Sequence, residues 1–182
     1  MNVPTDDEDT HWYQDDPPFA DPAIQLEYEA ALGRFLVAFN KIDNELTDLI
    51  RTVLRAHDRE DLFGKCAISV DFSRKVFHLD LLSLVSDPGK LGSAPLDEMK
   101  DIAGQRNTVA HGHFDQNPAD GAYQVKQKGK ALEFSVERIN GLTARCQIVW
   151  DRLRTLQAHY WLEPEIIEEI RDSSRLAPAG KP

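Results

Sequence analysis

The sequence predicts an all-α bundle that carries one β-hairpin, and three observations lead to this expectation. Apolar residues recur at helical spacing over two long segments, 22–57 and 137–162. Two shorter helical patterns lie between them. From about 121 to 136, alternation around a glycine turn is typical of a hairpin. We therefore expect a four-helix up-down bundle with the hairpin between the third and fourth main helices.

Length and charge define the domain organisation. The 182 residues, 41% of them hydrophobic, suffice for one domain with a real core. Of the 31 acidic residues, seven lie in residues 1–21, which hold none of the 21 Lys and Arg residues. We expect a flexible acidic arm over 1–21, the helical domain over 22–171 and a flexible tail over 172–182. The nearly balanced charge of the domain does not exclude an RNA partner.

The cysteine spacing and the hydropathy pattern favour a cytoplasmic location. Cys66 and Cys146 have neither zinc-type nor disulfide-framework spacing, which fits a reducing compartment. The chain begins with no basic-then-apolar leader, and no apolar run approaches the roughly 18 residues of a membrane span. We expect a cytoplasmic protein without a membrane partner.

The first helix is expected from Pro22 to His57. Leu36, Ile50 and Leu54 widen its apolar stripe, which favours packing in a bundle or use of both a core and a dimer face. The stripe alternates spacings of four and three and consists of Tyr28, Leu32, Phe35, Phe39, Ile42, Leu46, Leu49 and Val53.

Helix signals divide the middle of the chain. A connection at 58–70 precedes a second helix, which Asp71 or Ser73 caps and Asp87-Pro88-Gly89 ends. A third helix starts near Pro95 and carries acids in its first turn. Its apolar seam is expected at Leu96, Met99, Ala103, Arg106 and Ala110.

Arg106 stands on that apolar seam, so its guanidinium needs a partner, a cleft or a subunit interface. Gly112 is expected to end the third helix in a left-handed conformation. The hairpin follows, with Lys126, Lys128 and Lys130 near its tip as candidates for RNA binding or simply for solubility.

The last main helix is expected from about Glu137 to Leu162, and a further short helix is expected over residues 164–171. The inner face of the long helix consists of Ile139, Leu142, Cys146, Val149, Leu153, Leu156 and Tyr160.

The segment Arg106-Asn107-Thr108-Val109-Ala110-His111 resembles the marker of the HEPN superfamily of helical domains. The interval from Arg to His alone has little specificity, because it recurs at Arg51 with His57 and at Arg152 with His159. The Asn after Arg, the Gly after His and the position before the hairpin distinguish the segment at 106–111.

The resemblance implies a metal-independent endoribonuclease without a cofactor, in which two copies of the motif meet across a homodimer. In that role His111 transfers protons, Arg106 stabilises charge on phosphate and Asn107 orients either group. The products implied are a 2′,3′-cyclic phosphate and a 5′-hydroxyl. A toxin–antitoxin or phage-defence setting, with a cognate antitoxin or regulatory protein as partner, also rests on the resemblance.

Other interpretations remain open from the sequence. Many HEPN-like domains are interaction or nucleotide-binding modules that do not cleave RNA. His113 is a candidate accessory residue or a loop histidine. A metal site at His111 and His113 lacks the Glu-x-x-His spacing that a di-iron helix bundle carries. On an ideal helix Arg106 and His111 point about 140° apart, so either the helix ends or distorts at His111 or a second subunit completes the site.

Overall fold

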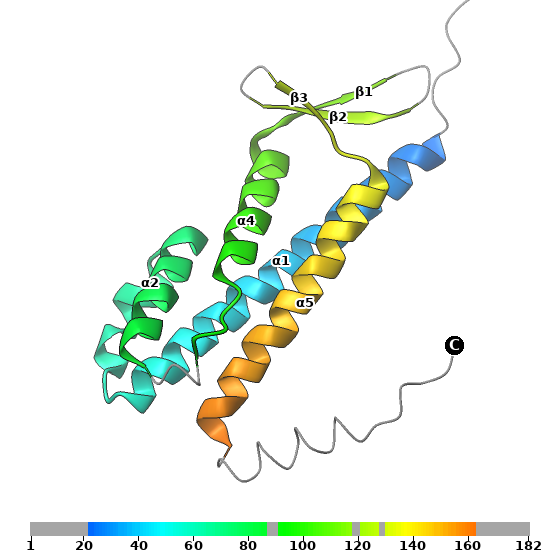
Figure 1. The fold of residues 1–182 in the computed structure, drawn as a ribbon. Helices are drawn as coiled ribbons and strands as arrows, with labels where there is room; N and C mark the ends of the chain where they lie inside the picture. The colour runs from blue at the N-terminus through cyan, green and yellow to red at the C-terminus, as the bar shows by residue number, and fades with distance from the viewer. Residues whose placement is uncertain (1–21, 87–90, 118–120, 128–129, 163–182) are drawn as a thin grey trace, which may run out of the picture.

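A computed structural model describes residues 22–86, 91–117, 121–127 and 130–162 (Figure 1). This part of the chain is mostly helical and carries one small antiparallel sheet at an end of the helical layer. The elements are α1 (Pro22–Ala56), η1 (Glu60–Leu62), η2 (Gly64–Ile68), α2 (Phe72–Val85), α4 (Leu96–His111), β1 (His113–Gln116), β2 (Tyr123–Gln127), β3 (Lys130–Glu133) and α5 (Val136–Trp161).

Several expectations fall outside these residues. They are the acidic arm at 1–21, the helix stop at 87–89, the short helix at 164–171 and the tail at 172–182. None of the helices that the structure describes has the length and hydropathy needed to cross a membrane.

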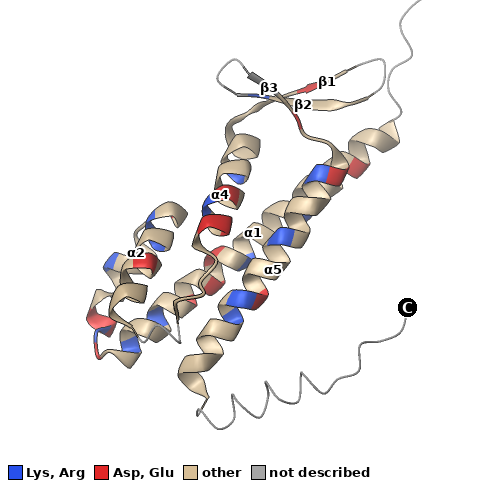
Figure 2. Cartoon of the chain, in the orientation of Figure 1, with Lys and Arg blue, Asp and Glu red and all other residues tan. Residues whose placement is uncertain are grey.

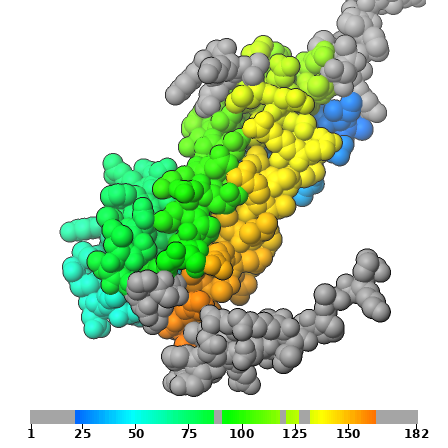
Figure 3. Space-filling model, viewed as in Figure 1, coloured from blue at the N-terminus to red at the C-terminus, as the bar shows by residue number. Residues whose placement is uncertain are grey.

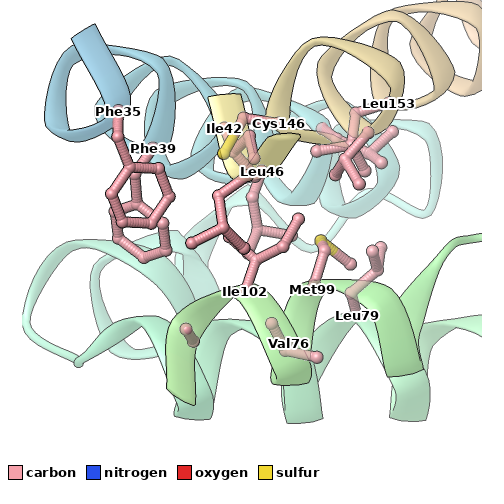
Figure 4. Packing of buried hydrophobic residues seen from close by; sticks show 14 of the residues in the cluster. Phe35, Phe39, Ile42, Leu46, Val76, Leu79, Met99, Ile102, Cys146 and Leu153 are labelled. Atoms are coloured by element: carbon pink, nitrogen blue, oxygen red, sulfur yellow. The ribbon is translucent and has the colours of Figure 1, made fainter. Parts of the chain in front are cut away.

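The two long helices α1 and α5 pack side by side and supply most of the core. Seven of the eight predicted stripe residues of α1 are buried, and Leu32 is partly buried against the core. On α5 the predicted inner face is buried from Ile139 to Leu156. Side chains of α2 and α4 close the core from the other side, where Val76, Leu79, Met99 and Ile102 meet those of α1 (Figure 4).

The helix directions differ from the expected up-down order. Arg34 bonds Asn140 and Thr52 bonds Gln157, so α1 and α5 run parallel. Helix α2 also runs parallel to α1, and α4 runs opposite to all three (Figure 1). The reason is the connection between α1 and α2, which folds as η1 and η2 and returns the chain along the bundle before α2 begins.

Two of the three residues that widen the apolar stripe of α1 belong to the core, as packing in a bundle requires. Ile50 and Leu54 are buried within the chain, and only Leu36 of the three widening residues is exposed. Exposed apolar side chains also gather along α2, whose first turn Asp71 caps by accepting a hydrogen bond from the Arg74 amide. These α2 residues are Phe77, Leu81, Leu84 and Val85.

The expected hairpin is part of a three-stranded sheet. β2 and β3 form the hairpin, and β1 adds a strand on the other side of β2. The sheet lies against the start of α1, where the ring of Tyr28 stacks on that of Tyr123 at 3.9 Å between centroids. Val125 of β2 is fully buried. The end of α4 therefore continues directly into a packed sheet.

Candidate functional site

Helix α4 carries the candidate residues and begins with the expected signals. Pro95 is its N-cap residue, and Asp97 and Glu98 lie in its first turn. The buried side chains are Met99, Ile102, Ala103 and Val109. At about 100° per residue, Arg106 falls inside the arc that these four residues span.

The predicted seam of α4 is wrong at its last position. Ala110 is exposed, whereas Val109 is buried. The helical period does not account for this, because a face that starts at Leu96 returns near residue 110 at about 3.6 residues per turn. The end of α4 packs against β2, so burial in this turn depends on the sheet and not on the seam.

Gly112 ends α4, but the expected left-handed conformation is wrong. Its φ of −81° and ψ of 155° are extended values that any residue can adopt. The requirement for glycine is steric, because a Cβ atom at this position would collide with Cγ1 of Val125 and with the carbonyl oxygen of Thr108. Gly112 thus lets the sheet approach the end of α4 closely.

The guanidinium of Arg106 is half-buried against α1. Its central carbon lies 5.6 Å from the centroid of the Phe39 ring, and Nη1 donates a 3.2 Å hydrogen bond to Oδ1 of Asn107. Nε is buried and has no hydrogen-bond partner among the described residues. An unpaired buried donor of this kind costs roughly 1–3 kcal/mol, more when the group is charged.

A pocket of about 340 Å³ opens beside Arg106 at the junction of three helices. Two carboxylates line it, and both have other partners: Asp43 accepts a 2.7 Å hydrogen bond from Lys75, and Asp71 caps α2. Neither forms a salt bridge with Arg106 in the described part of the chain. The lining residues are Phe39, Asn40, Asp43, Asp71, Phe72, Ser73, Ala103, Arg106 and Asn107.

His111 is the last residue of α4 and is exposed. Because the helix continues without a break from Arg106 to His111, the two side chains leave it about 140° apart. The structure therefore brings Arg106 and Asn107 together but directs His111 away from them.

The sheet places other candidate residues near His111. His113 begins β1, is exposed and lies opposite Lys126 of β2 in the sheet register. Nζ of Lys126 forms a 2.6 Å ion pair with Asp115, so part of its charge is neutralised on the sheet itself. Figure 2 shows an acidic position in red on β1. Lys130 begins β3, and Lys128 lies outside the described residues.

The remaining titratable candidates have structural roles. His57 lies 3.1 Å from the Ser86 hydroxyl, and Nδ1 of His78 lies 2.8 Å from the carbonyl oxygen of Cys66. Burial raises the pKa of the Cys146 thiol to about 11, which disfavours its thiolate as a nucleophile. Within the described ranges no three His, Cys, Asp or Glu residues gather closely enough to hold a metal ion.

Sequence spacing predicted Arg106, Asn107 and His111 but not the walls of the pocket. Asn40 and Asp43 come from the middle of α1, and Ser73 from the start of α2. In the sequence these positions resemble ordinary solvent-facing helix residues, and only the parallel course of α1 and α2 brings them to Arg106. Comparison of the chain with protein-family models, curated proteins and solved structures finds no match.

Proposed function

We propose that the protein is a metal-independent endoribonuclease of HEPN type, with Arg106, Asn107 and His111 as its catalytic residues. The observation that carries the proposal is the buried Nε of Arg106 beside an open polar pocket. A phosphate oxygen is the acceptor that a fork-shaped guanidinium binds best. Bound there, RNA would supply the hydrogen-bond partner that the described part of the chain does not.

The chemistry follows from the two side chains. The imidazole of His111 takes the proton from a ribose 2′-hydroxyl or gives one to the departing 5′-oxygen, since imidazole titrates near neutral pH. The 2′-oxygen attacks the adjacent phosphorus, and the bond from phosphorus to the 5′-oxygen breaks. Arg106 stabilises the charge that develops on the phosphate oxygens. The products are a 2′,3′-cyclic phosphate and a 5′-hydroxyl.

Completion of the site requires a second copy of the chain. The offset of about 140° directs Arg106 and His111 of one α4 away from each other, while His111 is exposed and accessible to a partner. We therefore place Arg106 of one subunit opposite His111 of the other in a homodimer. The proposed setting is a cytoplasmic toxin or phage-defence effector that a cognate antitoxin or regulatory protein controls.

The test is cleavage of a labelled RNA in the presence of EDTA. We expect the wild-type protein to release products that carry a 2′,3′-cyclic phosphate, which chromatography and mass spectrometry identify. Arg106→Ala and His111→Ala should each lower the rate at least 100-fold, because each removes a group that acts in the transition state.

Matched controls come from α5, where Arg152 and His159 have a similar interval. Arg152→Ala and His159→Ala should keep the rate within a few-fold of the wild type. Full cleavage by the Arg106 and His111 variants, with their circular dichroism unchanged, would show that the site lies elsewhere.

A second candidate function is a non-catalytic HEPN-like module that binds a protein, a nucleotide or RNA. The exposed apolar side chains of α2 favour it, since contiguous apolar surface is typical of protein interfaces. Under this alternative the RNA stays intact in the cleavage assay. Leu81→Asp or Leu84→Asp would then abolish partner capture, whereas His111→Ala would not affect it.

A further inference from the structure

A second recess lies between α1 and α5, away from the pocket at Arg106. It has a volume of about 690 Å³ and runs beside α1 from Ala30 to Lys41. The two helices lie side by side here, and α5 lies at the molecular surface along most of its length (Figure 3). The lining residues are Ala30, Gly33, Arg34, Val37, Ala38, Lys41, Asn140, Thr143, Ala144, Cys146, Gln147 and Trp150. We call this recess the α1/α5 groove.

The charge of the α1/α5 groove is opposite to that of the chain. The whole protein has a formal charge of −10, yet no Asp or Glu among the described residues lines the groove. Its two ionised groups are Arg34 and Lys41, both exposed, and neither forms a salt bridge in the described part of the chain. The groove is therefore suited to an anionic occupant.

The floor of the groove accommodates large side chains. Gly33, Ala30 and Ala144 present little bulk, and a Cβ atom built on Gly33 meets no atom within 4 Å. Val37 is 58% exposed although it is apolar, and the ring of Trp150 lies at one end. An occupant that combines acidic groups with aromatic or aliphatic side chains would satisfy both the cations and the apolar floor.

We propose that residues 1–21 of the same chain bind along the α1/α5 groove. They contain seven acids, no Lys or Arg, and the aromatic residues Trp12, Tyr13 and Phe19. Acidic side chains of this segment pair with Arg34 and Lys41, and its aromatic rings fill the recess over Gly33.

The covalent connection makes the binding sterically feasible. Lys41 lies 19 residues after Pro22, where α1 begins, which corresponds to about 28 Å along the helix. Trp12 precedes Pro22 by ten residues, which span up to about 33 Å when extended. The segment is therefore long enough to fold back beside α1 and to bring Trp12 and Tyr13 to the groove.

Other occupants fit less well. A symmetric dimer through this groove would bring the Arg34 and Lys41 of two copies toward one another, which like-charge repulsion opposes. RNA has the complementary charge, but residues 1–21 are tethered beside the groove at an effective concentration on the order of millimolar. In the free protein the tethered segment is favoured.

Photocrosslinking of the full chain tests the proposal. Val37→p-benzoylphenylalanine places a reactive group at the groove, and Leu84→p-benzoylphenylalanine places the same group on α2 as a control. Irradiation of dilute protein should link position 37 to a peptide from residues 1–21 of the same molecule, as mass spectrometry of the monomer band shows. The control at position 84 should give at least tenfold less of this product.

Further variants examine the steric and the electrostatic contributions to binding of residues 1–21 in the groove. Gly33→Leu adds a side chain whose Cβ meets no atom within 4 Å, and it should lower the crosslink yield at least fivefold by filling the recess. Gly104→Leu makes the same change at an open position on α4 and should not lower it. The combined change of Arg34→Glu and Lys41→Glu should also lower the yield, and 1 M salt should weaken the wild-type crosslink.

Several outcomes would overturn the proposal. Crosslinks from position 37 to helices of a second copy would identify the groove as a dimer interface. Crosslinks only to added RNA would identify it as a nucleic-acid surface. An undiminished crosslink to residues 1–21 in Gly33→Leu would show that contact occurs without occupation of the groove. None of these outcomes depends on ribonuclease activity.

Discussion

Arg106 combines a position among buried residues with a guanidinium that the nearby carboxylates do not pair. It falls within the buried arc of α4, its guanidinium lies over the ring of Phe39, and its Nε has no partner in the described part of the chain. A structural arginine would be expected to pair with a nearby carboxylate, but Asp43 bonds Lys75 instead. The proposed function gives this side chain a phosphate oxygen as its partner.

Gly112 allows a prediction about the steric role of glycine. Gly112→Ala should lower the free energy of unfolding by about 1–3 kcal/mol, because the added methyl group collides with Val125 and with the Thr108 carbonyl. Gly104→Ala, at an open helical position of the same element, should instead raise it by up to about 1 kcal/mol. Urea denaturation of both variants checks the pair; equal effects would mean that β2 does not approach α4 closely.

Tyr28 gives a prediction with a defined pH dependence. Its hydroxyl is buried without a partner among the described residues, and burial raises its pKa to about 12. The folded state therefore favours the neutral phenol. This contribution to stability is complete below the ordinary pKa of about 10 and is lost as the pH rises through 12.

Replacing Tyr28 with Phe removes the unpaired hydroxyl and keeps the ring that stacks on Tyr123. Tyr28→Phe should raise the free energy of unfolding by about 1 kcal/mol at neutral pH. The advantage over the wild type should grow between pH 10 and 12. Denaturation at several pH values measures the difference; a less stable variant would reveal a hydrogen bond to that hydroxyl.

At the scale of elements, a partly buried ion pair joins α1 to α2. Lys75 is 8% exposed, and its Nζ bonds Asp43 at 2.7 Å and Thr47 at 3.0 Å. Asp43→Ala leaves this cation without its carboxylate and should destabilise the protein by about 2 kcal/mol. Asp48→Ala, which removes an exposed 3.8 Å pair with Arg51, should cost less than about 0.5 kcal/mol.

Thermal unfolding of the two Asp variants compares the stability lost with the partly buried ion pair and the stability lost with the exposed one. If Asp43→Ala has no larger effect than Asp48→Ala, α2 is held to α1 by apolar contacts alone. The first turn of α2 forms one wall of the pocket at Arg106, so a loss of the contact between α1 and α2 would also alter that pocket.

The sequence predicts the elements with strong periodicity. The extents of α1, α4 and α5 are confirmed within a few residues, as are the N-cap at Asp71 and the inner face of α5 from Ile139 to Leu156. These features depend on local patterns of side chains, which repeat often enough to be recognised. The position of Arg106 among buried residues of α4 follows from the same patterns.

Features that depend on tertiary contacts could not be predicted. β1 is only four residues long, and its partner β2 defines it as a strand. The parallel course of α1, α2 and α5 depends on how η1 and η2 return the chain, which local spacing does not encode. The pocket at Arg106 depends on these directions in turn, so its walls on α1 and α2 were missed.

In the whole molecule, the sheet and the end of α4 gather the exposed candidate groups at one end (Figure 1). His111 precedes β1, and His113 lies opposite Lys126 in the sheet. Arg106 points instead toward α1 and the pocket. The proposed proton-transferring and phosphate-binding groups of one chain therefore lie on different sides, and the proposal assigns their meeting to a second copy.

Mixing two inactive variants tests this arrangement most directly. Arg106→Ala and His111→Ala protein are unfolded together, refolded at equal concentration and assayed on RNA in EDTA. In a mixed dimer one of the two composite sites retains both residues, so the mixture should recover about a quarter of the wild-type rate. Each variant refolded alone should stay inactive. Mixed dimers that form, as native mass spectrometry shows, but do not cleave RNA would contradict a site shared between two subunits.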